Sequence, residues 1–156
     1  MMTKLKSFLD TFLPPESSTH SDPKALISLA SAALMVEVLL SDYERKPEEK
    51  QTLLALLKSS FSLDQSTAEQ LLKQAEKAQY EATDYFRFTS QINDLCTPEE
   101  KIALIQNLWQ VAYADGELHY YEEHVIRRIA DLIYVSHTEF ITTKLKVTEA
   151  SNVMPT

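Results

Sequence analysis

Apolar residues recur along most of the chain at intervals of three and four, the spacing that places them on one face of an α-helix. The first long stripe consists of Leu26, Leu29, Ala33, Val36 and Leu40. Comparable stripes continue to about residue 146. The chain has one glycine among its 156 residues, which argues against an all-β fold because hairpins need residues with positive φ. The pattern therefore predicts an all-α fold, in a chain of the length of a single domain.

Several of the predicted helices begin at recognisable capping residues. Asp22 precedes a proline, which is favoured at the first position of a helix. Thr97 is followed by a proline and, at the third helical position, by Glu100, which is the pattern of a capping box. Ser136 and Glu139 form a second pair of this kind. These local signals predict where the helices start.

The same signals divide the chain into three parts. Residues 23–146 are expected to form the helical domain, with a break in the helical pattern near Glu81–Tyr85, and residues 147–156 a frayed, flexible tail. Residues 1–22 combine a short amphipathic helix, Met1–Leu13, with a polar linker. We expect this helix to pack on the domain. A helix that binds a membrane surface or a partner is the alternative.

The charge of the chain limits the classes of partner that it can bind. With 23 acidic and 15 basic residues the net charge is −8, so the chain repels the phosphates of nucleic acids. The lone Cys96 excludes an intramolecular disulfide and is expected to be a small buried side chain. No continuous apolar run reaches the roughly 20 residues of a membrane span. We expect a cytoplasmic protein whose partner is another protein and not a nucleic acid.

One acidic turn occurs twice, 73 residues apart. Both copies have the pattern Asp-x-Glu-x-x-x-x-Glu, and both fall between two predicted helices. An apolar position such as Val38 matches Val111 under the same shift, and the capped helix starts at Asp64 and Ser136 match with a slip of one residue. The acidic residues of the two copies are Asp42, Glu44 and Glu49, and Asp115, Glu117 and Glu122. We infer an internal repeat of two similar helical halves.

The repeated turn places carboxylates where a cation would stabilise them. Asp42 and Asp115 follow helix C-termini, where the helix dipole and unpaired carbonyls already present negative potential. Glu49 and Glu122 fall in the first turn of the next helix. Gly116 suits the left-handed conformation that often follows a helix end. Because hard cations bind carboxylate and carbonyl oxygens, we predict one composite or two neighbouring Ca²⁺ or Mg²⁺ sites, with Zn²⁺ less favoured. This prediction requires the two turns to be neighbours in space.

Other assignments of these residues remain open. The glutamates also suit helix N-termini, and Asp115-Gly116 also suits an ordinary turn. An acidic surface that contacts a basic partner protein and binds no metal is the alternative function. A hydrolase that uses the carboxylates with a metal is a third reading, but no nucleophile–base pair is visible and we expect no enzyme. Carboxylates exposed at helix junctions, as we expect these to be, fit ion ligands better.

The histidines and aromatic residues near the second turn receive structural assignments. His119 and His124 are five residues apart, which would place them on different faces of a helix and argues against a zinc enzyme. We expect them to lie on the surface or in packing positions, with His119 as an occasional ligand of the acidic site. We expect Trp109 and the tyrosines Tyr113, Tyr120 and Tyr121 to pack in the core and in the turn.

The second turn, Ala114–Leu118 followed by Glu122-Glu123, resembles the A-D-G-E-hydrophobic-x-x-E-E turn of the tellurite-resistance TerB-like family. The degenerate first copy, Leu40–Glu49, resembles that family's first acidic turn. Tyr43 stands where the family often has glycine, and Tyr120-Tyr121 stand where it often has a proline and an acid. The resemblance covers roughly residues 23–146.

The resemblance implies a bundle of about seven helices with internal pseudo-symmetry. It also implies a divalent-metal role where the acidic turns approach, and an association with tellurite and stress-response systems. Together with the residue pattern, it leads us to expect a non-enzymatic, TerB-like helical module that binds a divalent cation through the six acidic residues of the two turns.

Overall fold

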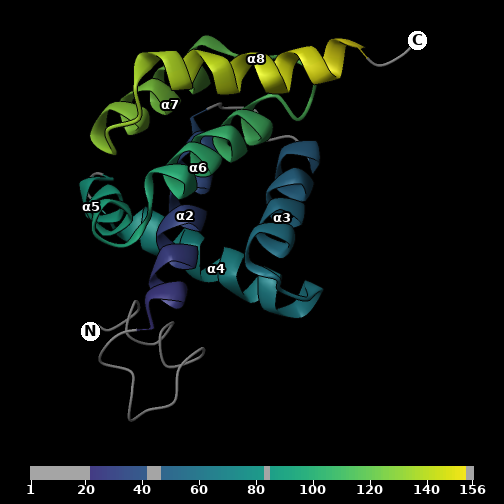
Figure 1. Ribbon diagram of the computed structural model, residues 1–156. Helices are drawn as coiled ribbons and strands as arrows, with labels where there is room; N and C mark the ends of the chain where they lie inside the picture. The colour runs from purple at the N-terminus through teal and green to yellow at the C-terminus, as the bar shows by residue number, and fades with distance from the viewer. Residues whose placement is uncertain (1–21, 42–46, 83–84, 154–156) are drawn as a thin grey trace.

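The computed structural model describes residues 22–41, 47–82 and 85–153, which form seven α-helices and no strand (Figure 1). The helices are α2 (Pro23–Leu40), α3 (Pro47–Phe61), α4 (Gln65–Glu81), α5 (Phe86–Leu95), α6 (Pro98–Ala112), α7 (Tyr120–Leu132) and α8 (His137–Val153). The all-α prediction is confirmed. The predicted segment Met1–Leu13 lies outside the described residues.

The predicted helix starts at Asp22 and Thr97 are formed by the expected side chains. The Asp22 carboxylate accepts a hydrogen bond from the N–H of Lys24 at 3.1 Å. At the start of α6 both bonds of the capping box are present, because Thr97 Oγ1 accepts from the N–H of Glu100 at 3.1 Å and Glu100 Oε1 accepts from the N–H of Thr97 at 2.8 Å. The break predicted near Glu81–Tyr85 separates α4 from α5. Local sequence therefore accounts for these boundaries.

The internal repeat pairs α2–α3–α4 with α6–α7–α8, and α5 connects the two halves (Figure 1). Beyond the acidic turns, the halves share a second feature. Both α3 and α7 are followed within two residues by a residue with positive φ, Ser62 at 57° and Tyr134 at 64°. In both, the next N–H donates to a carbonyl five residues back, at 3.0 and 2.9 Å. The N-caps Asp64 and Ser136 then open α4 and α8.

The central helix of the bundle is α2, which packs against α3, α4, α5, α6 and α7. Among the described helices it is the one long and apolar enough to cross a membrane by length and composition, and 61% of it is buried within the bundle. This helix has 18 residues and includes Lys24 and Glu37, so it is not the continuous apolar run of roughly 20 residues that was expected to be absent. A helix surrounded by five others must be apolar on most of its faces, which accounts for its composition without a membrane.

The last helix is longer than the sequence pattern predicted. α8 continues to Val153, whereas we expected it to end near Lys146. Val147 is 8% exposed and belongs to the core, so burial of its side chain favours a further turn. The next residue that cannot continue a helix is Pro155. The expectation of a frayed segment directly after residue 146 is thus wrong for residues 147–153.

Candidate functional site

The second acidic turn joins the end of α6 to the start of α7. Gly116 adopts a φ of +88°, as predicted, and its N–H donates to the carbonyl of Tyr113 at 3.0 Å. The Asp115 carboxylate accepts from the N–H of Glu117 at 3.0 Å. These two bonds reverse the chain within a few residues and hold the carboxyl group of Asp115 against the backbone of the turn.

His119 lies beside the carboxylates of this turn. Its Nε2 atom is 4.0 Å from Asp115 Oδ2 and 3.9 Å from Glu117 Oε1. Glu122 Oε1 accepts a hydrogen bond from the N–H of His119 at 3.2 Å. The backbone of residues 115–122 therefore brings one imidazole and two carboxylates together and ties a third carboxylate to the same residue.

The predicted ligands of this turn differ sharply in exposure. The side chain of Asp115 is 7% exposed, whereas that of Glu117 is 72% exposed. Glu122 is fully buried at the third position of α7, and Glu49 is fully buried at the third position of α3. The expectation that these carboxylates are exposed is wrong for Glu49 and Glu122, and also for the side chain of Asp115. A first-turn position permits their burial because the helix dipole and free N–H groups favour negative charge there.

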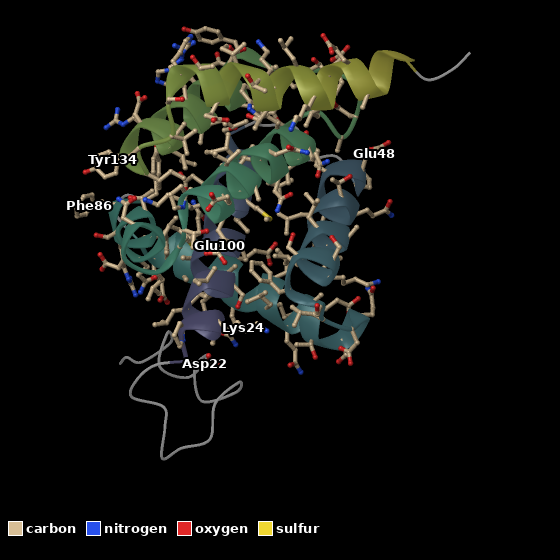
Figure 2. The ribbon with its side chains drawn as sticks, viewed as in Figure 1. Asp22, Lys24, Glu48, Phe86, Glu100 and Tyr134 are labelled. Carbon is tan, nitrogen blue, oxygen red and sulfur yellow. The ribbon has the colours of Figure 1, made fainter. Side chains whose placement is uncertain are left out.

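The first acidic turn is described in part. Asp42 and Glu44 lie outside the described residues, and Glu49 is the one predicted ligand of this turn that the structure places. Figure 2 shows its neighbour Glu48 projecting outward at the N-terminal end of α3. The prediction for Asp42 and Glu44 stays a prediction.

A hollow of about 390 Å³ lies between α3, the end of α6 and α8. Thr52 of α3, Tyr113 and Ala114 at the end of α6, and Lys146 and Ala150 of α8 all line it. Glu49 lies one helical turn before Thr52, and Asp115 follows Ala114 directly. The early turns of α3 and the start of the second acidic turn are thus close in space.

No metal-binding group is complete within the described part of the chain. Across residues 22–41, 47–82 and 85–153, no set of three or more His, Cys, Asp or Glu side chains is arranged to hold an ion. The four described candidates, Glu49, Asp115, Glu117 and Glu122, do not form such a set by themselves. A complete coordination sphere would require additional oxygen atoms, of which Asp42 and Glu44 are the predicted source.

The aromatic residues near the turn divide into buried and exposed groups. Trp109 is fully buried, and its Nε1–H lies 3.2 Å from the carbonyl of Phe140 and 3.1 Å from Thr143 Oγ1. Tyr120 and Tyr121 are 79% and 60% exposed. The packing prediction is confirmed for Trp109 and wrong for these two tyrosines, because the first turn of α7 faces solvent where they stand.

Cys96 is unsuited to nucleophilic chemistry. Cys96 is half-buried, not buried as expected. Its partial burial, and to a smaller extent the nearby Glu100 carboxylate, raise the pKa of the thiol to about 11. A thiol with this pKa is almost entirely protonated at neutral pH, and the thiolate is the reactive form.

Fold and site together define a class of protein: an all-α bundle of two similar three-helix halves, with acidic junctions between the first and second helix of each half. The family model of the tellurite resistance protein TerB matches residues 28–145, which is more than two thirds of the chain. The chain therefore belongs to the TerB family, as its acidic turns indicated. A search of curated proteins and a search of solved structures gave no match.

Proposed function

We propose that this TerB-family chain is a non-enzymatic cytoplasmic module that binds a divalent cation, Ca²⁺ or Mg²⁺, where its two acidic junctions approach. The ligands would come from Asp42, Glu44, Glu49, Asp115, Glu117 and Glu122. When bound, the ion would neutralise these carboxylates and link the two halves. We place this role in tellurite or stress response because of the family to which the chain belongs.

The observation that carries this proposal is the burial of an equivalent glutamate in each half. Glu49 and Glu122 occupy the same position of α3 and α7, 73 residues apart, and both are fully buried. Removing a carboxylate from water costs several kcal/mol unless hydrogen bonds or opposite charge compensate for it. Burial of a carboxylate at the same position of both halves suggests a role that both halves share, and divalent-cation binding is a role that uses such carboxylates.

The surroundings of Glu122 give further support. Asp115 is nearly buried in the same turn, and Glu117 remains exposed at its rim. A cation at this junction would find carboxylate oxygens from both the loop and the following helix. This combination of oxygen donors suits Ca²⁺ or Mg²⁺ better than Zn²⁺, which prefers nitrogen and sulfur.

Calorimetric titration of the full chain with Ca²⁺ and Mg²⁺, after removal of bound metal with a chelator, tests the proposal. We expect a heat of binding and a higher melting temperature, since an ion at 100 times its Kd stabilises the folded state by about 2.7 kcal/mol. Glu49→Gln and Glu122→Gln keep the side-chain shape and should weaken binding at least tenfold. Glu48→Gln, at the exposed neighbouring position, is the matched control and should leave the affinity unchanged.

Two results would refute cation binding. One is the absence of both heat and thermal stabilisation at millimolar Ca²⁺ and Mg²⁺. The other is an equal loss of affinity in Glu48→Gln and Glu49→Gln, because it would show that general surface charge, and not the buried position, attracts the ion.

A further inference from the structure

Two adjacent tyrosines form an exposed aromatic surface at the start of α7. Tyr120 is 79% exposed and Tyr121 is 60% exposed. Their ring centroids are 5.9 Å apart in an edge-to-face arrangement, and the Tyr120 ring stacks with the imidazole of His124 at 6.5 Å. The three rings thus form one continuous surface, here called the tyrosine face.

The fold does not require aromatic residues at these positions. In the first half the corresponding residues are Pro47 and Glu48, which begin the equivalent helix α3 without any aromatic ring. Neither tyrosine belongs to the core of the bundle. Exposed aromatic side chains grouped in this way are typical of sites that contact another protein, where tyrosine is enriched.

The charges around the tyrosine face favour a basic partner. Residues 113–126 contain four acidic residues and no lysine or arginine. Among these acids, Glu117 is 72% exposed, whereas Glu123 lies 3.4 Å from the Lys144 ammonium group and 4.0 Å from Arg127. Glu117, three residues before Tyr120 in the sequence, therefore adds an exposed carboxylate to this segment, 3.9 Å from the His119 imidazole. The net charge of −8 adds long-range attraction for a cationic partner.

The tyrosine rings are also available to cations. Within the described residues, lysine and arginine side chains lie over the rings of Phe88, Trp109, Tyr134 and Phe140, but over neither Tyr120 nor Tyr121. Arg127, two turns further along α7, is directed at the Phe140 ring at 5.3 Å. The faces of the two tyrosines are thus not occupied by cations of the described chain.

We propose that the tyrosine face binds a lysine- or arginine-rich segment of a partner protein. Cationic side chains of this segment stack on the Tyr120 and Tyr121 rings, and Glu117 pairs with a neighbouring positive charge. This inference goes beyond the proposed cation site, because it requires no metal and rests on two tyrosines that are not among the proposed ligands; Glu117 is the one residue that the two proposals share.

Fluorescence anisotropy tests the proposal with the full chain and a labelled synthetic peptide of alternating arginine and serine, in the presence of chelator. We expect Tyr120→Ala/Tyr121→Ala to weaken peptide binding about tenfold, as the loss of two cation–π contacts implies. Tyr80→Ala is the matched control, since Tyr80 is 86% exposed on α4 and should leave the affinity unchanged. Glu117→Gln should weaken binding about threefold and make it less sensitive to salt.

A second double variant separates cation recognition from general apolar contact. Tyr120→Leu/Tyr121→Leu keeps bulky apolar side chains but removes the aromatic rings, and we expect it to lose affinity as the alanine variant does. Circular dichroism should show a native helix content for both variants, because the replaced side chains are exposed.

Several results would overturn the inference. Unchanged binding by either double variant would exclude recognition through the rings. Equal affinity for a glutamate–serine peptide would exclude a basic partner. Self-association of the chain, abolished by Tyr120→Ala/Tyr121→Ala in analytical ultracentrifugation, would instead assign the face to a second copy. Because chelator is present throughout the peptide assay, its result tests the tyrosine face alone. The calorimetric titration tests the metal site separately.

Discussion

Replacing Gly116 by alanine tests the geometry of the second acidic turn directly. Gly116 has a φ of +88°, and a Cβ atom added to it would have no heavy atom within 4 Å apart from its own residue and its two chain neighbours. The substitution therefore creates no steric clash with neighbouring groups, and its effect comes from the backbone alone. An L-residue in the left-handed region costs about 1–2 kcal/mol. Alanine also lowers the conformational entropy of the unfolded chain, which by itself would raise the free energy of unfolding by about 0.4–1 kcal/mol.

The difference between these contributions predicts that Gly116→Ala lowers the free energy of unfolding by about 1 kcal/mol. For a chain of this size such a loss corresponds to a melting temperature lower by about 2–4 °C. Urea denaturation followed by circular dichroism measures the free energy, and calorimetry measures the temperature. Gly116→Asn is the control, because asparagine tolerates the left-handed conformation and should lose less than alanine.

An alanine variant as stable as the parent, or more stable, would refute this reasoning. It would mean that residue 116 does not hold a positive φ in solution or that the turn relaxes without cost. A loss well above 3 kcal/mol would also contradict it, since only a clash or a wider rearrangement of the turn has that magnitude.

Three further predictions concern single side chains: two that form hydrogen bonds and one thiol with a raised pKa. Asn93→Ala removes the side-chain donor to the carbonyl of Leu132 at 2.9 Å, which joins α5 to the end of α7, and should cost about 1–2 kcal/mol in urea denaturation. Thr97→Ala removes the acceptor for the N–H of Glu100 and should cost about 1 kcal/mol by the same assay. Burial raises the pKa of the Cys96 thiol from 9.0 to about 11, so its labelling rate by a disulfide reagent should be low at neutral pH and rise up to about pH 11. Because the unfolded chain loses this proton first, stability should fall as pH rises through this range.

Helix starts were predictable from the sequence because capping is a local interaction. The side chain of Asp22 or Thr97 reaches an N–H group two or three residues ahead, whatever the rest of the chain does. The break between α4 and α5 and the positive φ of Gly116 were predictable for the same reason. The end of α8 was not, because packing of Val147 in the core extends this helix beyond the range that local pattern indicates.

The candidate site was only partly predictable. The repeat marked Glu49 and Glu122 as equivalent residues, but first-turn glutamates usually face solvent, and no local signal indicated that both would be buried. The exposure of Tyr120 and Tyr121 was missed because large aromatic residues next to an apolar stripe are expected to join the core. A useful signal was present all the same: the first half has Pro47 and Glu48 at these positions, so the bundle does not need aromatic side chains there.

The sequence by itself determined the all-α fold, the internal repeat, most helix starts and the family to which the chain belongs, since these depend on periodicity and on contacts between residues close in the chain. The tertiary structure decided which carboxylates are buried, which tyrosines face solvent and how the early turns of α3 approach the end of α6. The approach of α3 to the end of α6, for example, brings together residues about 60 positions apart, such as Thr52 and Tyr113, which only the packing of the helices can do. Whether a side chain is buried depends on how the helices pack, and it cannot be predicted from the residue pattern along a single helix.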